Sequence, residues 1–195
     1  MLSHQISLVT TLALALPILH DCECARPDPD PDPDPDQPKI VFVTQALFPG
    51  DLGGLEGADV LCTEEAARAG LSGTYTAWLS DATGDAVTRI TPSSTGYARV
   101  DGTVIADDLA DLTDGELDAE ISLDQFGDLV MELLWTRTTE AGLAEPGAPD
   151  CLGWTSGSAA ELGRVGANAT RFEGWSNSNT ARPCDSASPL YCFED

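Results

Sequence analysis

Carboxylates are the chemically active side chains that the sequence supplies in quantity. The two histidines, His4 and His20, lie near the amino terminus, in a segment that we expect to be removed or excluded from the fold. Mechanisms that need an imidazole in the mature chain, such as Ser–His, Cys–His and His–zinc chemistry, are therefore excluded. Lys39 stands at the edge of the predicted domain, a poor place for a buried amine nucleophile. A carboxylate pair of the glycosidase type remains, but no motif specifies one, so we expect a protein that is not an enzyme.

The cysteines indicate an oxidising compartment. Four of the six lie in the body of the chain without any Cys-x-x-Cys spacing, so disulfides are favoured over a zinc site. Four cysteines allow three different pairings, and this count alone leaves them open. The six residues are Cys22, Cys24, Cys62, Cys151, Cys184 and Cys192.

The amino-terminal segment predicts export. A largely apolar run of 14 residues, Ile6 to Leu19, is too short to span a bilayer but matches the length of a signal-peptide core. We therefore expect residues 1–25 to be a signal peptide or lipoprotein signal. Cys22 follows this run directly and is a candidate for lipidation; the alternatives are a third disulfide with Cys24 or removal with the signal. The expected location is extracellular or at a cell surface, including the outer membrane if Cys22 is lipidated.

A spacer follows the signal. Pro27 to Asp36 reads Pro-Asp five times and has no apolar side chain to bury. Ten residues of polyproline II backbone would reach about 30 Å, and repulsion among the carboxylates stiffens them. We expect residues 26–38 to be an acidic spacer and residues 39–195 to be one folded domain.

The charge limits the partners. The formal charge of the chain is −24, and residues 39–195 carry 26 acidic against eight basic residues. Such a surface repels nucleic acid, heparin-like polyanions and anionic lipid head groups. We expect no nucleic-acid partner, no heparin-like ligand, and membrane contact only through a lipid anchor. An acidic cluster between Asp107 and Glu120 lacks the EF-hand spacing and is interpreted as a solvated loop.

The elements predicted within the domain are few helices and many short strands, which indicates an α+β fold. A helix is expected at Ala58–Ala69 because apolar residues recur at helical spacing before Gly70. Asp101-Gly102 predicts a hairpin turn. The expected strands are Lys39–Thr44, Tyr75–Ser80, the Ala98–Ile105 hairpin, Met131–Thr136, Cys151–Thr155, Phe172–Trp175 and Leu190–Phe193.

Several of these residues occur in a familiar order. The opening carries Gly57-Ala58-Asp59, Cys62, Ala66, Gly70 to Thr74 and Ala77-Trp78-Leu79-Ser80; the remainder carries Trp135, Cys151, Trp154-Thr155, Trp175, Cys184 and Leu190 to Glu194. Over about residues 39–195 this order resembles the endostatin domain of collagens and the C-type-lectin-like pattern. It resembles more closely a family of bacterial surface lipoprotein domains of unknown function. The resemblance implies a C-type-lectin-like (endostatin-like) α+β fold with one or two helices, short antiparallel strands and a long loop region.

The resemblance also implies two nested disulfides, Cys62–Cys192 and Cys151–Cys184. The outer pair would close a very long segment, for which chain entropy gives about 4–5 kcal/mol of stabilisation. In C-type-lectin-like domains the long loop region carries the ligand site. Residues 140–150 and 175–183 are therefore where the resemblance places binding.

Two short motifs resemble the calcium site of sugar-binding C-type lectins: Glu145-Pro146-Gly147 and Trp175-Ser176-Asn177. Gly147 has no side chain and Ser176 offers only a neutral hydroxyl, whereas calcium takes six to eight oxygen ligands. Calcium is thus the one cofactor to consider, with Glu145 and Asn177 as candidate ligands. Glu145, Trp175 and Asn177 are the candidate ligand-binding residues.

The sequence therefore predicts an exported recognition or adhesion module that binds a protein or a glycan through its long loop region. The expectation of a binding function rests on analogy with proteins of the same fold. Two alternatives stay open, a carboxylate-dependent glycan hydrolase and a structural component of a surface coat.

Overall fold

The computed structural model describes residues 37–195. The predicted signal segment, Cys22 and Cys24, and the Pro-Asp repeat lie outside these residues. Within residues 37–195, no helix is both long and apolar enough to cross a membrane.

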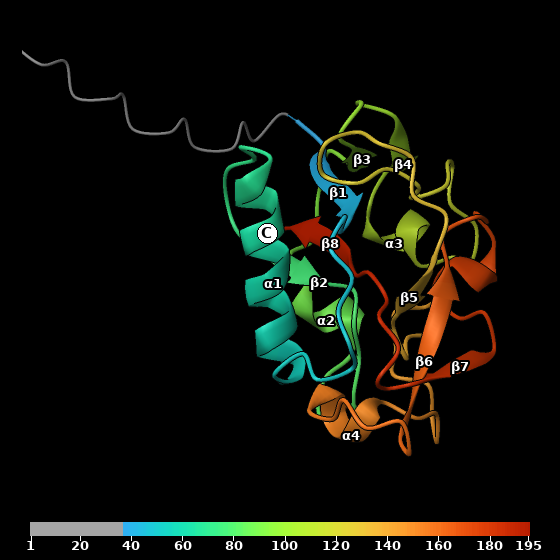
Figure 1. Cartoon of the computed structure of the whole chain (residues 1–195). Coiled ribbons are helices and arrows are strands. Elements are labelled where there is room, and N and C mark those ends of the chain that lie inside the picture. The colour runs from blue at the N-terminus through green and yellow to red at the C-terminus, as the bar shows by residue number, and fades with distance from the viewer. Residues whose placement is uncertain (1–36) are drawn as a thin grey trace, which may run out of the picture.

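A mixed five-stranded sheet forms the centre of the fold (Figure 1). Its strand order is β2-β8-β1-β3-β4, with β1 and β8, the first and last strands, paired antiparallel. A second, antiparallel sheet has the order β5-β6-β7. The strands are β1 Lys39–Val43, β2 Tyr75–Ala77, β3 Tyr97–Arg99, β4 Val104–Ala106, β5 Leu133–Trp135, β6 Leu162–Ala167, β7 Thr180–Pro183 and β8 Tyr191–Glu194.

One long helix, α1 (Gly54–Arg68), runs along one side of the molecule, and the remaining helices are single turns (Figure 1). The short ones are α2 Ala86–Arg89, α3 Leu109–Leu112, α4 Cys151–Trp154 and the 3₁₀ turn η1 Glu173–Trp175. The α+β class is thereby confirmed. The helix begins at Gly54, about one turn before the expected start at Ala58, because the two left-handed glycines Gly53 and Gly54 already turn the chain into the helix.

Side chains alternate between the two faces of the central sheet along each strand, and both faces are buried. Val41 and Val43 of β1 and Phe193 of β8 belong to one core cluster, whereas Phe42 and Cys192 belong to the other. The second cluster contains Ala58, Cys62 and Ala66, four residues apart on the inner face of α1. The helix thus covers the face of the sheet that carries Phe42.

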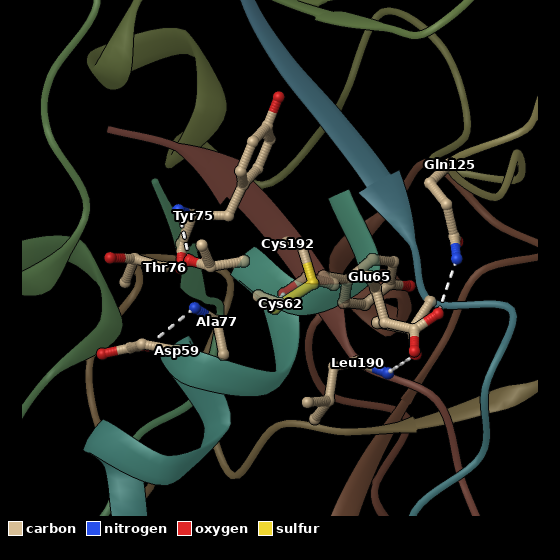
Figure 2. Close-up of a disulfide and its surroundings, with 12 residues drawn as sticks. Asp59, Cys62, Glu65, Tyr75, Thr76, Ala77, Gln125, Leu190 and Cys192 are labelled. Carbon is tan, nitrogen blue, oxygen red and sulfur yellow. Dashed lines mark hydrogen bonds between the residues drawn. A yellow bond between two sulfur atoms is a disulfide. The ribbon is translucent and has the colours of Figure 1, made fainter. Parts of the chain in front are cut away.

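The two disulfides join Cys62 to Cys192 and Cys151 to Cys184, which confirms the nested pairing. Figure 2 shows the first bond crossing from α1 to β8, between the side chains of Tyr75 and Leu190. On the same helix, Asp59 accepts a 2.9 Å hydrogen bond from the backbone N–H of Ala77 in β2 (Figure 2). Glu65, which is 3% exposed, accepts a 2.6 Å hydrogen bond from the side chain of Gln125. Helix α1 is therefore tied to β2, β8 and the Gln125 loop by specific bonds as well as by packing.

Two expected strands are wrong. Residues 151–154 form a left-handed turn in which all four φ angles lie between 51° and 68°. Residues 173–175 form a 3₁₀ turn that places Trp175 in the core. In both segments the aromatic side chain is buried by a turn instead of by a pleated strand, so the apolar run misled the strand prediction. Strands β6 and β7 were not predicted, because Gly163 and Gly166 weaken the strand pattern of β6 and β7 is short and polar.

The hairpin β3–β4 was predicted, and its loop differs in detail. Gly102 has the expected positive φ of 82°, but Asp101 does not lie in the left-handed region. Instead, the Asp101 carboxylate accepts a 3.0 Å hydrogen bond from the N–H of Thr103. The turn is therefore held by a side chain of the loop and one glycine.

Replacing both Cys62 and Cys192 by Ser is expected to lower the free energy of unfolding by about 5 kcal/mol, because the bond closes a segment of 130 residues in the denatured chain. The matched control, Cys151→Ser with Cys184→Ser, opens a segment of 33 residues and should cost about 4 kcal/mol. Urea unfolding of the two double variants measures both values. A loss below about 2 kcal/mol for the first pair would contradict this assignment of the outer disulfide.

The three tyrosines predict alkaline unfolding. Burial raises the pKa of Tyr75, with Glu194 adding to the shift; burial also raises the pKa of Tyr97 and of Tyr191 above the ordinary value of 10.0. The unfolded chain loses these protons near pH 10 while the folded chain keeps them, so stability should fall as pH rises through 10, by up to about 1.4 kcal/mol per pH unit for each tyrosine. Tyrosinate absorbance and circular dichroism, followed together, should change in one step above pH 10. Tyrosinate that forms near pH 10 in a fully folded chain would contradict the burial.

Candidate functional site

An open polar groove lies around the loop that follows β2. Two hollows, of about 490 Å³ and about 280 Å³, share the residues Asp81, Thr83, Gly84 and Thr88. The first extends to the amino-terminal end of α1, and the second extends to Arg137 and to Ala144-Glu145-Pro146. We call this surface the Asp81 groove. It joins the long loop region, where binding was expected, to a part of the chain that the sequence did not single out.

The loop itself is an Asx turn. Oδ1 of Asp81 accepts hydrogen bonds from the N–H of Thr83 at 2.6 Å, from the hydroxyl of Thr83 at 2.7 Å and from the N–H of Gly84 at 3.0 Å. Such a turn is a local consequence of an Asp that is followed by Thr and Gly two and three residues later. The groove therefore contains a carboxylate of fixed orientation.

Ser80, next to Asp81, holds the start of the loop by hydrogen bonds. Its hydroxyl accepts a 2.9 Å hydrogen bond from the N–H of Ala86 and lies 2.9 Å from the hydroxyl of Thr138. Its carbonyl accepts a 2.9 Å hydrogen bond from the indole N–H of Trp154. The start of the loop is thus connected to α2, to β5 through its following residues, and to the left-handed turn of α4.

That turn holds backbone strain close to the groove. The non-glycine residues Cys151, Leu152 and Trp154 have φ angles of 51°, 60° and 61°, and each costs on the order of 1–2 kcal/mol. The disulfide to Cys184 and the complete burial of Trp154 hold it in place. Leu152, in contrast, is 63% exposed. Strain of this kind clusters at functional sites, and Figure 1 shows α4 beside the amino-terminal end of α1.

The wall formed by residues 142–146 is tied to the Asp81 loop and α2 by two hydrogen bonds. Oδ1 of Asp85 accepts a 2.7 Å hydrogen bond from the N–H of Ala144, and the N–H of Val87 donates to the carbonyl of Gly142 at 3.0 Å. A side chain at Gly142 would overlap Val87 and Trp78. Glycine is therefore required where the two walls meet.

Ion pairs at the groove join side chains from distant segments. Arg164 pairs with Glu145 at 2.7 Å, and Arg137 pairs with Asp150 at 3.3 Å. Although Nε of Arg164 and Oε2 of Glu145 are not aligned as a hydrogen bond, a 2.7 Å separation between opposite charges makes them partners. Glu145 is therefore held by an arginine at the groove's edge.

The three predicted ligand residues lie in different environments in the structure. Glu145 lines the groove. Asn177 is half-buried, and its Oδ1 accepts a 3.0 Å hydrogen bond from the N–H of Asn179. Trp175 must be corrected: it is completely buried, with its ring 5.1 Å from that of Trp78 and 5.5 Å from that of Tyr191, so it presents no surface to a ligand.

The motif around Trp175 is part of the core. The hydroxyl of Ser176 accepts a hydrogen bond from the indole N–H of Trp78 at 2.8 Å and lies within 3.0 Å of the carbonyls of Thr138 and Thr139. Residues 175–183 line neither hollow of the groove. The likeness to a calcium-binding motif is therefore explained by packing at this position.

No group of three or more Asp, Glu, His or Cys side chains suited to a metal occurs in residues 37–195. Glu145, a candidate calcium ligand, is engaged by Arg164. Between Asp107 and Glu120, the carboxylates of Asp108, Asp111 and Asp114 accept hydrogen bonds from nearby backbone N–H groups. These acids serve as caps of local turns.

A further hollow of about 470 Å³ lies between Gln37–Ile40, the loop 92–95 and the carboxyl-terminal residues Glu194 and Asp195. It surrounds the point at which the chain enters the domain. The Glu194 carboxylate there accepts a 2.7 Å hydrogen bond from the N–H of Ile40, which closes the ends of β1 and β8. This hollow is explained by the meeting of the start of β1 and the end of β8.

A scan against protein-family models and a search of curated proteins find no match to this chain.

Arg89 positions the groove, because its guanidinium donates to the carbonyls of Ala77 and Leu79 and to the carboxylate of Asp59, at 3.1, 2.7 and 2.6 Å. Arg89→Lys should lower the free energy of unfolding by about 1–3 kcal/mol, since one ammonium cannot satisfy all of these acceptors. The control is Arg171→Lys, at the exposed pair with Glu116, where we expect a change below about 0.5 kcal/mol. Equal effects of the two substitutions in urea unfolding would contradict the positioning role.

Proposed function

We propose that this protein is an exported recognition module that binds a protein or a glycan in the Asp81 groove and releases it unchanged. The observation that carries the proposal is the preformed groove itself, in which Glu145 and Pro146 of the long loop region face the ordered Asp81 loop. Binding sites are typically concave, largely preformed and equipped with a few oriented polar groups. Strained residues at its border, Arg137 with φ 51° and the turn at Leu152, support the same assignment.

The proposal includes a C-type-lectin-like fold and a location outside the cell or at its surface. Support for the fold comes from the adjacency of the first and last strands, the single long helix, and the nested disulfides. Support for the location comes from the same disulfides, which persist in oxidising compartments. The acidic composition supports partners other than nucleic acid or heparin-like polyanions.

A carboxylate-dependent glycan hydrolase is the second candidate, because Asp81, Asp85 and Glu145 line the same hollow. Binding is preferred because no motif specifies a catalytic pair and each of these carboxylates has at least one oxygen fixed by a neighbouring group. Oδ1 of Asp81 and Oδ1 of Asp85 accept backbone hydrogen bonds, and Glu145 is paired with Arg164.

The experiment screens the full, oxidised chain against a glycan array and a displayed peptide library, beside the variant Ala82→Trp. Ala82 is exposed, lines the groove and contributes no side-chain hydrogen bond, so a Trp blocks the groove without removing a polar contact. The matched control is Ala110→Trp, at an exposed position of α3 outside both hollows. We expect ligands of the wild type to lose at least about tenfold in affinity for Ala82→Trp, about 1.4 kcal/mol, and to be unaffected by the control.

Ligands that bind both variants equally, or a screen that yields no ligand, would contradict the proposal. Release of shortened glycans by the wild type would favour the hydrolase instead.

A further inference from the structure

One oxygen of the Asp81 carboxylate is left without a partner. The side chain is nine-tenths buried, since the residue is 8% exposed, and all three of its hydrogen bonds go to Oδ1. Oδ2 accepts no hydrogen bond from any residue between 37 and 195, and Asp81 lines both hollows of the groove. Oδ2 is not one of the fully buried polar atoms that lack a partner, so it stays open to a donor at the groove. A donor that enters the groove would complete its bonding.

The charges around Asp81 favour a cation as that donor. Both arginines that line the groove are already neutralised, Arg89 by Asp59 and Arg137 by Asp150. Glu145 is neutralised by Arg164. The remaining acids that line the groove, Glu56, Asp81 and Asp85, have no ion-pair partner among the described residues. The unpaired charge of the groove is therefore negative.

The walls suit a long aliphatic stem. Apolar contacts are offered by Leu55 in the first hollow and by Ala82, Ala144 and Pro146 in the second. Lysine and arginine place their methylene groups along such surfaces while the charged end reaches a polar partner. No aromatic residue lines either hollow, and all four tryptophans are completely buried, so the groove has no ring on which a sugar could stack. Among the two ligand classes considered, these walls favour a protein.

We propose that the Asp81 groove receives an arginine or lysine side chain of a protein partner, with the cation on Oδ2 of Asp81 and its stem along Leu55 and Ala82. Asp85 adds a second negative charge to the same hollow. The inference rests on the proposed function, since it names the ligand class of that groove. The partner's surface is basic where it meets this one, which agrees with the acidic character of the whole chain.

The test is a titration of the full, oxidised, ¹⁵N-labelled chain with N-acetyl-arginine methylamide and N-acetyl-lysine methylamide, followed through backbone amide signals. The neutral probe is N-acetyl-citrulline methylamide, which has nearly the shape of the arginine probe but no charge. We expect the cationic probes to shift the amides of Thr83, Gly84 and Ala144, and the citrulline probe to bind at least about tenfold more weakly.

Asp81→Asn is the decisive variant, because its Oδ1 can still accept the bonds that hold the turn while the charge is lost. We expect at least about a tenfold loss of affinity for the arginine probe. Asp114→Asn is the matched control, since Asp114 also accepts a backbone bond, at 3.0 Å, in an exposed turn outside the groove. It should change the affinity less than about twofold.

Three results would overturn the inference: no shift in the groove, equal binding of citrulline, or shifts spread over the acidic surface with the same response in both variants. The two proposals fail separately. If Ala82→Trp abolishes ligand binding but Asp81→Asn does not, the cation proposal is wrong and the groove remains the binding site. If Ala82→Trp still binds the ligands, the groove is not the binding site.

Discussion

The antiparallel pairing of β1 with β8 is the contact on which the remaining structure depends. It joins strands at opposite ends of the domain, with Phe42 opposite Cys192 in the register. The same cysteine is bonded to Cys62 of α1, and β2 pairs with the other edge of β8. Contacts of such large sequence separation carry a high loop-closure cost, which the disulfide and the two-sided burial of the sheet offset. Once the ends are joined, the position of α1 over the sheet is determined.

The shape of the groove depends on the joining of β1 and β8. The first hollow is bordered by the start of α1, and Arg89 links α1 to the end of β2 through Asp59 and the carbonyl of Ala77. The inner disulfide holds the strained turn at residues 151–154, whose Trp154 in turn anchors Ser80. Two disulfides therefore act on one loop from two directions. Oδ2 of Asp81 is left without a partner because all three hydrogen bonds of the turn go to Oδ1.

Local patterns in the sequence predicted the elements that local forces decide. The helix around Cys62, strands at Lys39 and Leu190, and the hairpin at Gly102 all follow from periodicity and turn chemistry. The prediction failed where a buried aromatic sits on a turn, as Trp154 and Trp175 do, because an apolar run does not distinguish a turn from a strand. Of the three predicted ligand residues, Glu145 alone lines the groove. Asp81 could have been noticed, since Asp with Thr and Gly two and three residues later signals an Asx turn, but the hollow depends on contacts between residues more than 50 positions apart.

Amide hydrogen exchange of the oxidised chain tests whether the groove is rigid and preformed. We expect the slowest amides to lie in β1 and β8, including Phe42 and Cys192. The amides of Thr83 and Gly84 should exchange at least about tenfold more slowly than those of an unstructured chain, because each donates to Asp81. Exchange of Thr83 and Gly84 at the rate of an unstructured chain, beside a protected β1–β8 pair, would contradict a rigid, preformed groove.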